Sequence, residues 1–429
     1  MLMFIKLLKY YVSLFYWEKA SLQKVKKMQI KKFRKIFEHA RKYSKFYKDI
    51  YTQYGVMDLK IKNFEDIKKV PVINKAMLRK YSARDIMTTN ISEQHNKHST
   101  SGSSGEPFVL YSDKFTDYTS HVRVYFILKK IARYNPFMKI TMITRYEKNE
   151  QFQVEKDLSF LSKLQKKLGL FQREIISIYE DPEVIIEKII HSKPHILWST
   201  PSVMEVVANK LKEKDLHLRI PYLYFTSEHL NPGQIKKFND YISKNIVDIY
   251  GAMESPSLGY EYNSSGKRML FPNSNFFELH DAKDYDGEKY GKTVITNLLN
   301  FTMPIIRYDL NDLCEIKDEP EVPYKYIGNI IGRADDILEF PDGSKFVHHH
   351  AYEMFMDFEE CDHYKFEQKG KETIKLLLKP NKKYSNEEIK AKAIDRWNKR
   401  FKKYPLEIEF VTEFVIDPKT GKFKNIEKK

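Results

Sequence analysis

The chain has 429 residues, of which 42% are apolar and 31% charged, and it contains 28 Phe and 29 Tyr. This composition excludes a disordered chain and predicts a folded protein of two or three domains. The two cysteines, Cys314 and Cys361, lack His or Cys neighbours at ligand spacing. Neither a zinc site nor a disulfide framework is therefore expected, and a reducing cytoplasm is the simplest location.

Positive charge is concentrated at the N-terminus. Residues 1–50 hold 14 Lys and Arg against 3 acids, so they carry +11 of the net charge of +16 and leave +5 for the other residues. Because the charge is local and not spread over one folded face, we expect no nucleic-acid partner.

Residues 1–17 are apolar, but Lys6 and Lys9 interrupt them, and the run is too short for a relaxed transmembrane span. No small-residue cleavage site follows, which argues against a signal peptide. Lys6, Lys9 and Ser13 fall on one stripe of a helix. The helix either lies in the plane of an anionic membrane, supported by the lysines of 24–48, or packs on its own domain.

Helical periodicity continues through residues 18–50. Further along, Pro71 ends a helix that begins near Phe64, and Asn74 is a plausible N-cap for the next helix. These segments lead to Ser99–Pro107, whose hydroxyl and glycine residues are Thr100, Ser101, Gly102, Ser103, Ser104 and Gly105. Such a backbone can direct N–H groups and hydroxyls at an anion, although a Ser/Gly run can also be a plain linker. It is not a P-loop, because a strand-like run (108–111) follows it instead of Gly-Lys-Ser/Thr opening a helix.

Between residues 108 and 250, apolar strands alternate with amphipathic helices. The expected strands are 140–144, 175–178, 195–198, 222–226 and one that begins at 247; the expected helices are 182–191, 203–214 and one after Pro232. This alternation predicts parallel α/β layers, in which ligands bind at the carboxyl ends of the strands. Glu228, which follows the strand 222–226, is for this reason a candidate cofactor-binding residue.

The later part of the chain predicts short strands at 276–279 and 293–297 and an apolar strand at 304–313 that ends in acids. Gly332-Arg333-Ala334-Asp335-Asp336 breaks the pattern, so we expect a domain boundary near 332. Beyond it the sequence predicts a strand (373–378), a helix (386–401) and a second strand (408–411).

Five stretches in fixed order resemble the signature motifs of the adenylate-forming superfamily, which includes acyl-CoA synthetases, luciferases and nonribosomal-peptide adenylation domains. They are residues 100–107, 250–254, 307–312, 332–336 and 420–424. Residues 44–47 and 70–75 are similar to the phenylacetate–CoA ligase branch, which includes the capsular-polysaccharide biosynthesis proteins. The resemblance spans about residue 35 to the C-terminus.

The resemblance implies roles for individual residues in activating a carboxylate with ATP, a reaction in which charge grows on the phosphate oxygens. Residues 100–105 would hold the β- and γ-phosphates, Glu254 would hold Mg²⁺, and Tyr250, followed by Gly251, would line the adenine pocket. Asp312 would bind the ribose hydroxyls, because an ionised carboxylate accepts two hydrogen bonds.

In the last part of the chain, Arg333 would lie near the ribose and phosphates, and Asp335 would be the hinge of the C-terminal domain. Lys422 would reach the α-phosphate and the substrate carboxylate, a task that suits a charge on a long flexible stem. Without the resemblance, Glu254 is an exposed acid at a helix start and Tyr250 a core tyrosine. Arg333 and Asp335 are then a surface pair, and Lys422 is one lysine of a basic tail.

Two stretches depart from the family pattern. Asp309-Leu310-Asn311-Asp312 stands where relatives have Arg-Thr-Gly-Asp, and His348-His349-His350 stands where relatives have a Gly-Val-x-Val-x-Pro turn. Three consecutive histidines do not easily face one metal ion, so a metal site there is not expected.

The sequence thus predicts an α/β protein with the adenylate-forming enzyme fold. A basic helical segment (1–50) would belong to a large nucleotide- and acyl-binding domain that continues through 51–331, and a small mobile α+β lid would follow (332–429). The expected activity is ATP- and Mg²⁺-dependent formation of an acyl adenylate, then acyl transfer to CoA or a carrier thiol, in envelope or capsular polysaccharide metabolism. Alternatives are a sugar amine or hydroxyl as acceptor, direct adenylylation of a hydroxyl, and a catalytically silent scaffold at the membrane.

Overall fold

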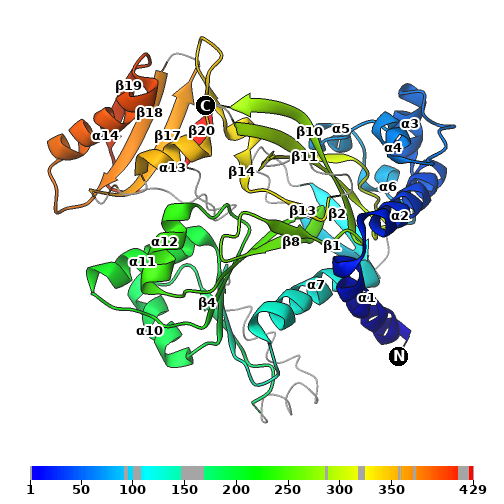
Figure 1. Cartoon of the computed structure of the whole chain (residues 1–429), viewed down its shortest axis with the longest axis horizontal. Helices are drawn as coiled ribbons and strands as arrows, with labels where there is room; N and C mark the ends of the chain where they lie inside the picture. The colour runs from blue at the N-terminus through cyan, green and yellow to red at the C-terminus, as the bar shows by residue number, and fades with distance from the viewer. Residues whose placement is uncertain are drawn as a thin grey trace. The chain divides into compact units, whose positions relative to one another are not determined.

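The computed structural model describes residues 2–90, 95–99, 108–145, 169–285, 288–316, 324–355, 358, 360–370, 373–413 and 425–428. The chain divides into two compact units (Figure 1). Unit 1 comprises residues 1–134, 249–261 and 265–330; unit 2 comprises 135–248, 262–264 and 331–429. The chain passes between them after Tyr134, within β7 (Ile246–Ala252) and within β14 (Ile330–Arg333), and residues 262–264 return briefly to unit 2.

Unit 1 begins with helices whose first turns are closed by short polar side chains. Ser21, Ser44, Asn63, Asn74 and Ser82 each accept a hydrogen bond from a backbone N–H of the first turn, as N-caps do. The helices are α1 (Leu2–Lys19), α2 (Leu22–Tyr43), α3 (Lys45–Gln53), α4 (Phe64–Lys69), α5 (Lys75–Arg79), α6 (Ala83–Ile86) and, capped by Asp113, α7 (Lys114–Ala132).

The strands of unit 1 are mainly antiparallel. β1 (His95–Ser99) pairs with β2 (Val109–Asp113), and a second sheet has the order β10 (Asn275–Tyr285), β11 (Glu288–Asn297), β12 (Tyr308–Glu315). β8 (Ser255–Tyr262), β9 (Arg268–Leu270) and β13 (Tyr326–Ile327) are neighbours in a third sheet. Apolar side chains of α2, α3 and these sheets form one core, in which Phe33 and Phe64 contact Phe276.

Unit 2 contains the parallel α/β layer. Its strands are β3 (Ile140–Thr144), β4 (Arg173–Ser177), β5 (Ile196–Ser199) and β6 (Tyr222–Thr226), in the order β4-β3-β5-β6. The helices α10 (Pro182–Ser192), α11 (Pro201–Glu213) and α12 (Pro232–Tyr241) each begin with proline, which is pre-organised for the first helical position. They lie along the strands (Figure 1) and share an apolar core with them.

The rest of unit 2 is an α+β module around Trp397, which is 1% exposed. Its elements are η1 (Ala334–Asp336), β15 (Leu338–Glu339), β16 (Lys345–Phe346), α13 (His348–Phe355), β17 (Cys361–Lys369), β18 (Thr373–Pro380), α14 (Asn386–Phe401), β19 (Leu406–Phe410) and β20 (Ile426–Lys428). The larger sheet has the order β19-β18-β17-β20. The domain boundary near 332 stays a prediction.

Most of the expected elements are confirmed, and three details are corrected. The expected strands at 276–279 and 293–297 belong to one long hairpin: the first lies near the start of β10, and the second is the end of β11. The strand expected from 304 begins at Tyr308, because Arg307 takes a left-handed backbone conformation (φ 48°) that interrupts an extended chain. Ser13 lies on the same helical stripe as the exposed Lys6 and Lys9 but is half-buried, and its hydroxyl is bonded to Tyr10 O and to Asn273.

Helix α1 packs on unit 1 with one side and exposes apolar residues on the other. Tyr10 and Leu14 are buried, and Phe15 contacts Phe126 of α7. Leu8 and Val12 are 51% and 60% exposed. Packing on its own domain is therefore confirmed for one face of this helix. None of the helices in the described residues has the length and hydropathy needed to cross a bilayer.

Candidate active site

Glu254 lies in the two-residue turn that joins β7 to β8. A turn between strands replaces the alternative of an acid at a helix start. The Asn297 side-chain amide donates to Glu254 O (3.1 Å), which fixes the backbone of the turn. Within the described part of the chain, no hydrogen bond or ion pair engages the Glu254 carboxylate. Its oxygens are thus able to take a cation.

The backbone on both sides of this turn is tightly constrained. A Cβ on Gly251 would lie 2.7 Å from Ser257 N, closer than side-chain carbons approach backbone, so only glycine fits here. Ser257 has φ 55°, a left-handed conformation that costs a non-glycine residue energy and clusters at functional sites. The buried guanidinium of Arg123 donates to Pro256 O and Ser257 O. Two hydrogen-bond donors, Asn297 and Arg123, therefore hold the turn and the residues that follow it.

Tyr250 and Asp312 are in direct contact in unit 1. The phenolic O–H of Tyr250 donates to Asp312 Oδ2 at 2.8 Å. Burial and the Asp312 carboxylate raise the pKa of Tyr250 well above its ordinary value, so the hydroxyl keeps its proton and stays a donor. The sequence placed these two residues in one nucleotide site through separate motifs, and the structure brings them together.

The departure at residues 309–312 keeps the backbone shape that a glycine would give. Asn311 has φ 61°, and asparagine tolerates this left-handed region better than other non-glycine residues. Its N–H donates to Asp309 Oδ1 (2.7 Å). The β11–β12 register shifts at this point, between the pairs Lys292–Leu313 and Val294–Asp309. Asp312, the partner of Tyr250, lies in this bulge.

The two N-terminal stretches that resemble the ligase branch contact the start of β12. Ile73 pairs with Tyr308, since Ile73 N donates to Arg307 O and Asp309 N donates to Ile73 O, both at 2.9 Å. The hydroxyl of Tyr47 donates to Pro304 O (2.9 Å) and accepts from Ile306 N (3.0 Å). Three of the sequence motifs thus meet in unit 1.

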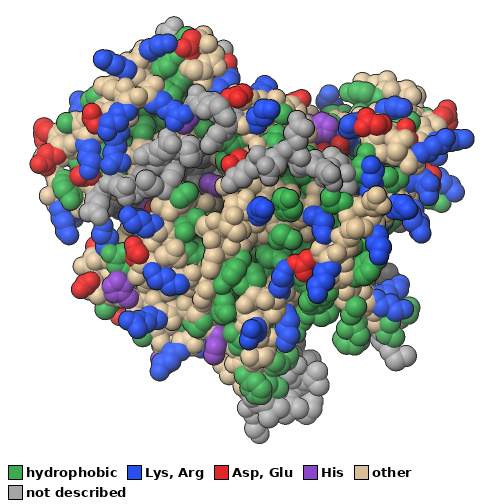
Figure 2. Space-filling model, in the orientation of Figure 1, with side chains coloured by type: hydrophobic (Ala, Val, Ile, Leu, Met, Phe, Trp, Pro, Cys, Tyr) green, Lys and Arg blue, Asp and Glu red, His purple; other side chains and the backbone are tan. Residues whose placement is uncertain are grey.

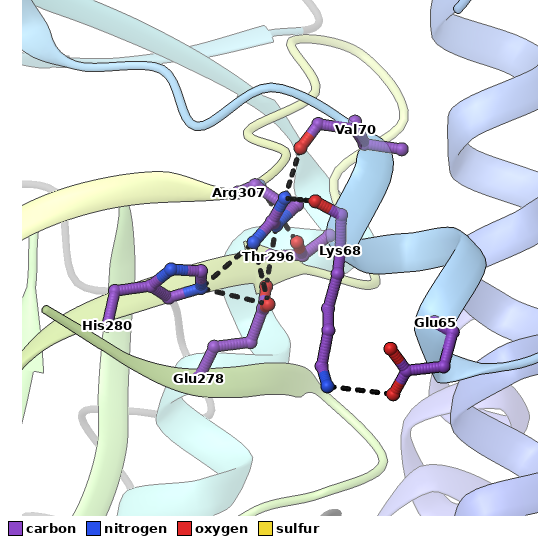
Figure 3. Close-up of polar contacts among 7 residues, drawn as sticks. All are labelled: Glu65, Lys68, Val70, Glu278, His280, Thr296 and Arg307. Atoms are coloured by element: carbon purple, nitrogen blue, oxygen red, sulfur yellow. Dashed lines mark hydrogen bonds and ion pairs between the residues drawn. The ribbon is translucent and has the colours of Figure 1, made fainter. Parts of the chain in front are cut away.

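Figure 3 shows a buried ionic network beside β12 that the sequence reasoning missed. Arg307 forms two hydrogen bonds of 3.0 Å with the carboxylate of Glu278, and His280 Nε2 lies 2.9 Å from Arg307 Nη2. Arg307 also donates to the carbonyls of Lys68 and Val70. The network joins the end of α4 to the sheet that carries Asp312. The signal was available, because Arg307 stands in the motif 307–312, but its partners are far away in sequence.

Glu228 closes the first turn of α11 in unit 2. Its carboxylate accepts from Ser202 N and Ser202 Oγ, each at 2.9 Å, where a negative charge also suits the helix N-terminus. Thr200, the residue at the N-cap position, forms no side-chain cap bond. A part in cofactor binding stays a prediction for Glu228.

Arg333 and Asp335 are exposed, at the end of β14 and in η1 of unit 2. Gly332 before them has φ 125°, which only glycine adopts readily. Their roles at the nucleotide and at the hinge stay predictions. Residues 100–105 and Lys422 lie outside the described residues, and their roles also stay predictions.

His350 is a core residue of unit 2. It is 3% exposed, its Nδ1 accepts from Val347 N (3.2 Å), and its ring contacts Phe346 and Phe401. Across the described residues, no group of three or more His, Cys, Asp or Glu is arranged to hold a metal ion. A magnesium ion needs no such group, because it is commonly bound by one or two carboxylates together with substrate phosphates. The single acid Glu254 fits that donor set.

The chain resembles curated and solved ligases. No protein-family model matches it. It is 24% identical to protein CapK of Staphylococcus aureus over 336 residues, 73% of this chain and 68% of that protein. It is 28% identical to phenylacetate-coenzyme A ligase of Pseudomonas putida over 158 residues, and this match spans 34% of the chain and only 35% of that ligase.

Among solved structures, 2-hydroxyisobutyryl-CoA ligase in the postadenylation state with 2-HIB-AMP superposes with a TM-score of 0.74. The identity is 17%, and the match covers 94% of this chain and 89% of that one. This confirms the expected fold, an α/β structure with a large domain and a smaller C-terminal domain.

Proposed function

We propose that this chain, a member of the adenylate-forming superfamily in its phenylacetate–CoA ligase-like branch, is an AMP-forming acyl-CoA ligase. In the first step a carboxylate oxygen attacks the α-phosphorus of ATP, and the P–O bond to pyrophosphate breaks to give an acyl adenylate. In the second step the thiol of CoA attacks the acyl carbon, loses its proton and releases AMP.

The observation that carries this proposal is the contact between Tyr250 and Asp312 beside the braced turn of Glu254. The Tyr250 hydrogen bond occupies one carboxylate oxygen of Asp312 and so orients the group. An ionised carboxylate can accept several hydrogen bonds, and Asp312 would also accept from the ribose hydroxyls. The ring of Tyr250 would offer an apolar face to adenine.

Glu254 would hold Mg²⁺, which neutralises charge on the departing pyrophosphate when bound. The hydroxyls and amides of residues 100–105 would hold the β- and γ-phosphates, with Arg333 near the ribose. Lys422 would pair with the α-phosphate and the substrate carboxylate. Rotation about Asp335 would exchange the adenylation and transfer arrangements.

A second proposal concerns the acceptor of the acyl group and the metabolism in which the protein acts. The likeness to CapK supports a place in capsular or envelope polysaccharide metabolism. A sugar amine or hydroxyl would then replace the thiol, or a hydroxyl would be adenylylated directly. A catalytically silent scaffold is the remaining alternative.

Release of pyrophosphate from ATP and Mg²⁺ in the presence of a carboxylate library tests the proposal. Acid-dependent release that Asp312→Asn and Glu254→Gln slow strongly but leave measurable would support it. Offering CoA, amino sugars and hydroxyl compounds in the second step would identify the acceptor. Binding of ATP without pyrophosphate release by any acid would instead favour the scaffold.

We further propose that α1 holds the protein at the inner face of the membrane, on an anionic lipid surface. Leu8, Val12 and Tyr16 recur every four residues and are exposed, next to Lys9 and Lys19. Figure 2 shows hydrophobic and basic side chains together over the N-terminal helices. Apolar side chains would enter the interface, and each nearby lysine would add ~1 kcal/mol on an anionic leaflet.

Co-sedimentation with phosphatidylserine vesicles tests this surface, with phosphatidylcholine vesicles as the control. Leu8→Glu with Val12→Glu should abolish binding, and raising the salt should weaken it, because the Debye length falls from ~10 Å at 0.1 M to ~3 Å at 1 M. The proposal would be contradicted if the full-length protein co-sedimented with neither kind of vesicle.

A further inference from the structure

Arg123 is a buried cation whose hydrogen bonds converge on the segment that follows Glu254. It lies on α7 and is 3% exposed. Its Nε donates to Ser257 O (2.9 Å), and one terminal nitrogen donates to Pro256 O. The other terminal nitrogen donates to the hydroxyl of Tyr10 (2.9 Å) and, at 3.4 Å, to Thr119 Oγ1.

All these partners are neutral oxygens. In the described part of the chain no carboxylate forms an ion pair with Arg123, although burying a charge is costly unless it is paired or fully hydrogen-bonded. An apolar residue at position 123 would avoid the free-energy cost of burying this charge. The fork geometry of the guanidinium explains the choice, since one planar group reaches two successive carbonyls and a hydroxyl, which a lysine cannot do.

The two carbonyls belong to a strained part of the backbone. Ser257 is left-handed at φ 55° and its backbone nitrogen lies close to Gly251, so the segment keeps this shape only while its surroundings hold it. Glu254 lies two residues before Pro256. A shift of the carbonyls would therefore move the turn that carries the Glu254 carboxylate.

The other end of the network is on α1. Tyr10 is 8% exposed, and its hydroxyl lies 2.6 Å from Ser274 Oγ. Because it accepts from Arg123, its own proton is available to Ser274, which donates in turn to Asn273 Oδ1 (3.3 Å). The next residue, Asn275, accepts from Ser255 Oγ through Oδ1. Tyr10 is thus bonded to both supports of the β8 start, Arg123 and the segment 273–275.

We propose that Arg123 and Tyr10 are positioning residues for the Glu254 turn, so that the seating of α1 sets the affinity for the magnesium–ATP complex. The inference rests on the proposed function, because it takes Glu254 as the magnesium-binding acid. Neither residue contacts the nucleotide; both act through the backbone of 255–257.

Hydrogen exchange of the backbone amides in 253–257 tests the positioning without any substrate. Tyr10→Phe keeps the ring and removes only the hydroxyl, and Arg123→Lys keeps the charge and removes the fork. Both should speed exchange in this segment by about tenfold. Tyr11→Phe is the matched control on the same helix, since Tyr11 contacts Phe15 and Tyr125 through its ring. Wild-type exchange in both variants overturns the inference, whatever the enzyme's activity.

The two half-reactions then separate positioning from general damage. Arg123→Lys should raise the KM for magnesium–ATP in pyrophosphate exchange by ~10-fold or more, because small misplacements at a site are costly. Acyl transfer from a pre-made acyl adenylate should be unchanged. Adding Glu254→Gln should remove the effect of Arg123→Lys, since coupled residues are not additive. Equal loss of activity in both half-reactions would overturn the inference. If the wild-type protein catalyses no ATP–pyrophosphate exchange, only the proposed function is refuted.

Discussion

Replacing Tyr250 by phenylalanine removes one proton donor from Asp312 and leaves the ring in place. The hydroxyl donates to an ionised carboxylate at 2.8 Å, and the raised pKa of Tyr250 keeps it protonated beyond the ordinary range of tyrosine. We therefore expect Tyr250→Phe to weaken ATP binding and to leave stacking on the adenine intact.

The size of the effect follows from the kind of bond. A hydrogen bond to a charged group contributes about 1.5–3 kcal/mol. Only the share of this free energy that orients Asp312 toward the ribose contributes to ATP binding, so we expect a loss of at most ~1.5–2 kcal/mol in binding free energy. Because 1.4 kcal/mol corresponds to a tenfold change, the KM for ATP should rise by about 10- to 30-fold.

ATP–pyrophosphate exchange at varied ATP measures this directly, with saturating acid. Tyr260→Phe is the matched control, because that buried hydroxyl accepts from Lys130 on another part of unit 1. The combination Tyr250→Phe with Asp312→Asn should be no worse than Asp312→Asn alone. A KM for ATP within twofold of the wild-type value would refute the assignment of Asp312 as oriented by Tyr250.

Changes at the turn, at the buried ion pair, at Lys422 and in alkaline pH should each have a measurable effect. Gly251→Ala should raise the KM for magnesium–ATP at least tenfold, because the new methyl would meet Ser257 N at 2.7 Å. Arg307→Met should lower the free energy of unfolding in urea by ~3–5 kcal/mol, since the buried Glu278 carboxylate would lose its arginine. Lys422→Ala should slow acyl-adenylate formation by ~10²–10³ and spare transfer from a pre-made adenylate. Burial raises the pKa of Tyr260 and Tyr324 to about 12, so these groups bind more protons when folded than when unfolded, and urea unfolding should show stability falling above about pH 10. Lys32 has the opposite effect on stability. Burial lowers its pKa to about 8, so the unfolded state binds more protons than the folded state and the free energy of unfolding rises between pH 8 and about pH 10.

The sequence correctly predicted those helices and strands whose bounds depend on residues within or next to the segment. The strands 140–144 and 222–226 and the helix 386–401 have the expected bounds, because short apolar runs and a capping serine are contained in the segments themselves. The hairpin β10–β11 is longer than expected, since residues 280–285 are mostly polar and join the strand through pairing with the partner strand. Pairing energy of this kind is not visible in one segment.

The candidate site divides in the same way. Tyr250, Glu254 and Asp312 belong to motifs that a sequence displays, and Asn311 shows why the departure from glycine is tolerated. Arg123 and Glu278 carry no such signal, because a single charged residue on a helix or strand is usually solvated. Their burial depends on backbone carbonyls and an arginine that lie more than twenty residues away in sequence.

Helix α1 explains why residues 1–17 allowed two interpretations. One face supplies Tyr10 and Leu14 to the domain, and the opposite face presents Leu8 and Val12 to the surroundings, so the segment is apolar on two sides. A helix that is apolar all round is expected where both sides are covered. Deletion of 1–17 would remove both functions together, whereas changes confined to Leu8 and Val12 alter the outer face alone. If the inner face braces the Glu254 turn through Tyr10, whatever covers the outer face can influence catalysis by seating the helix.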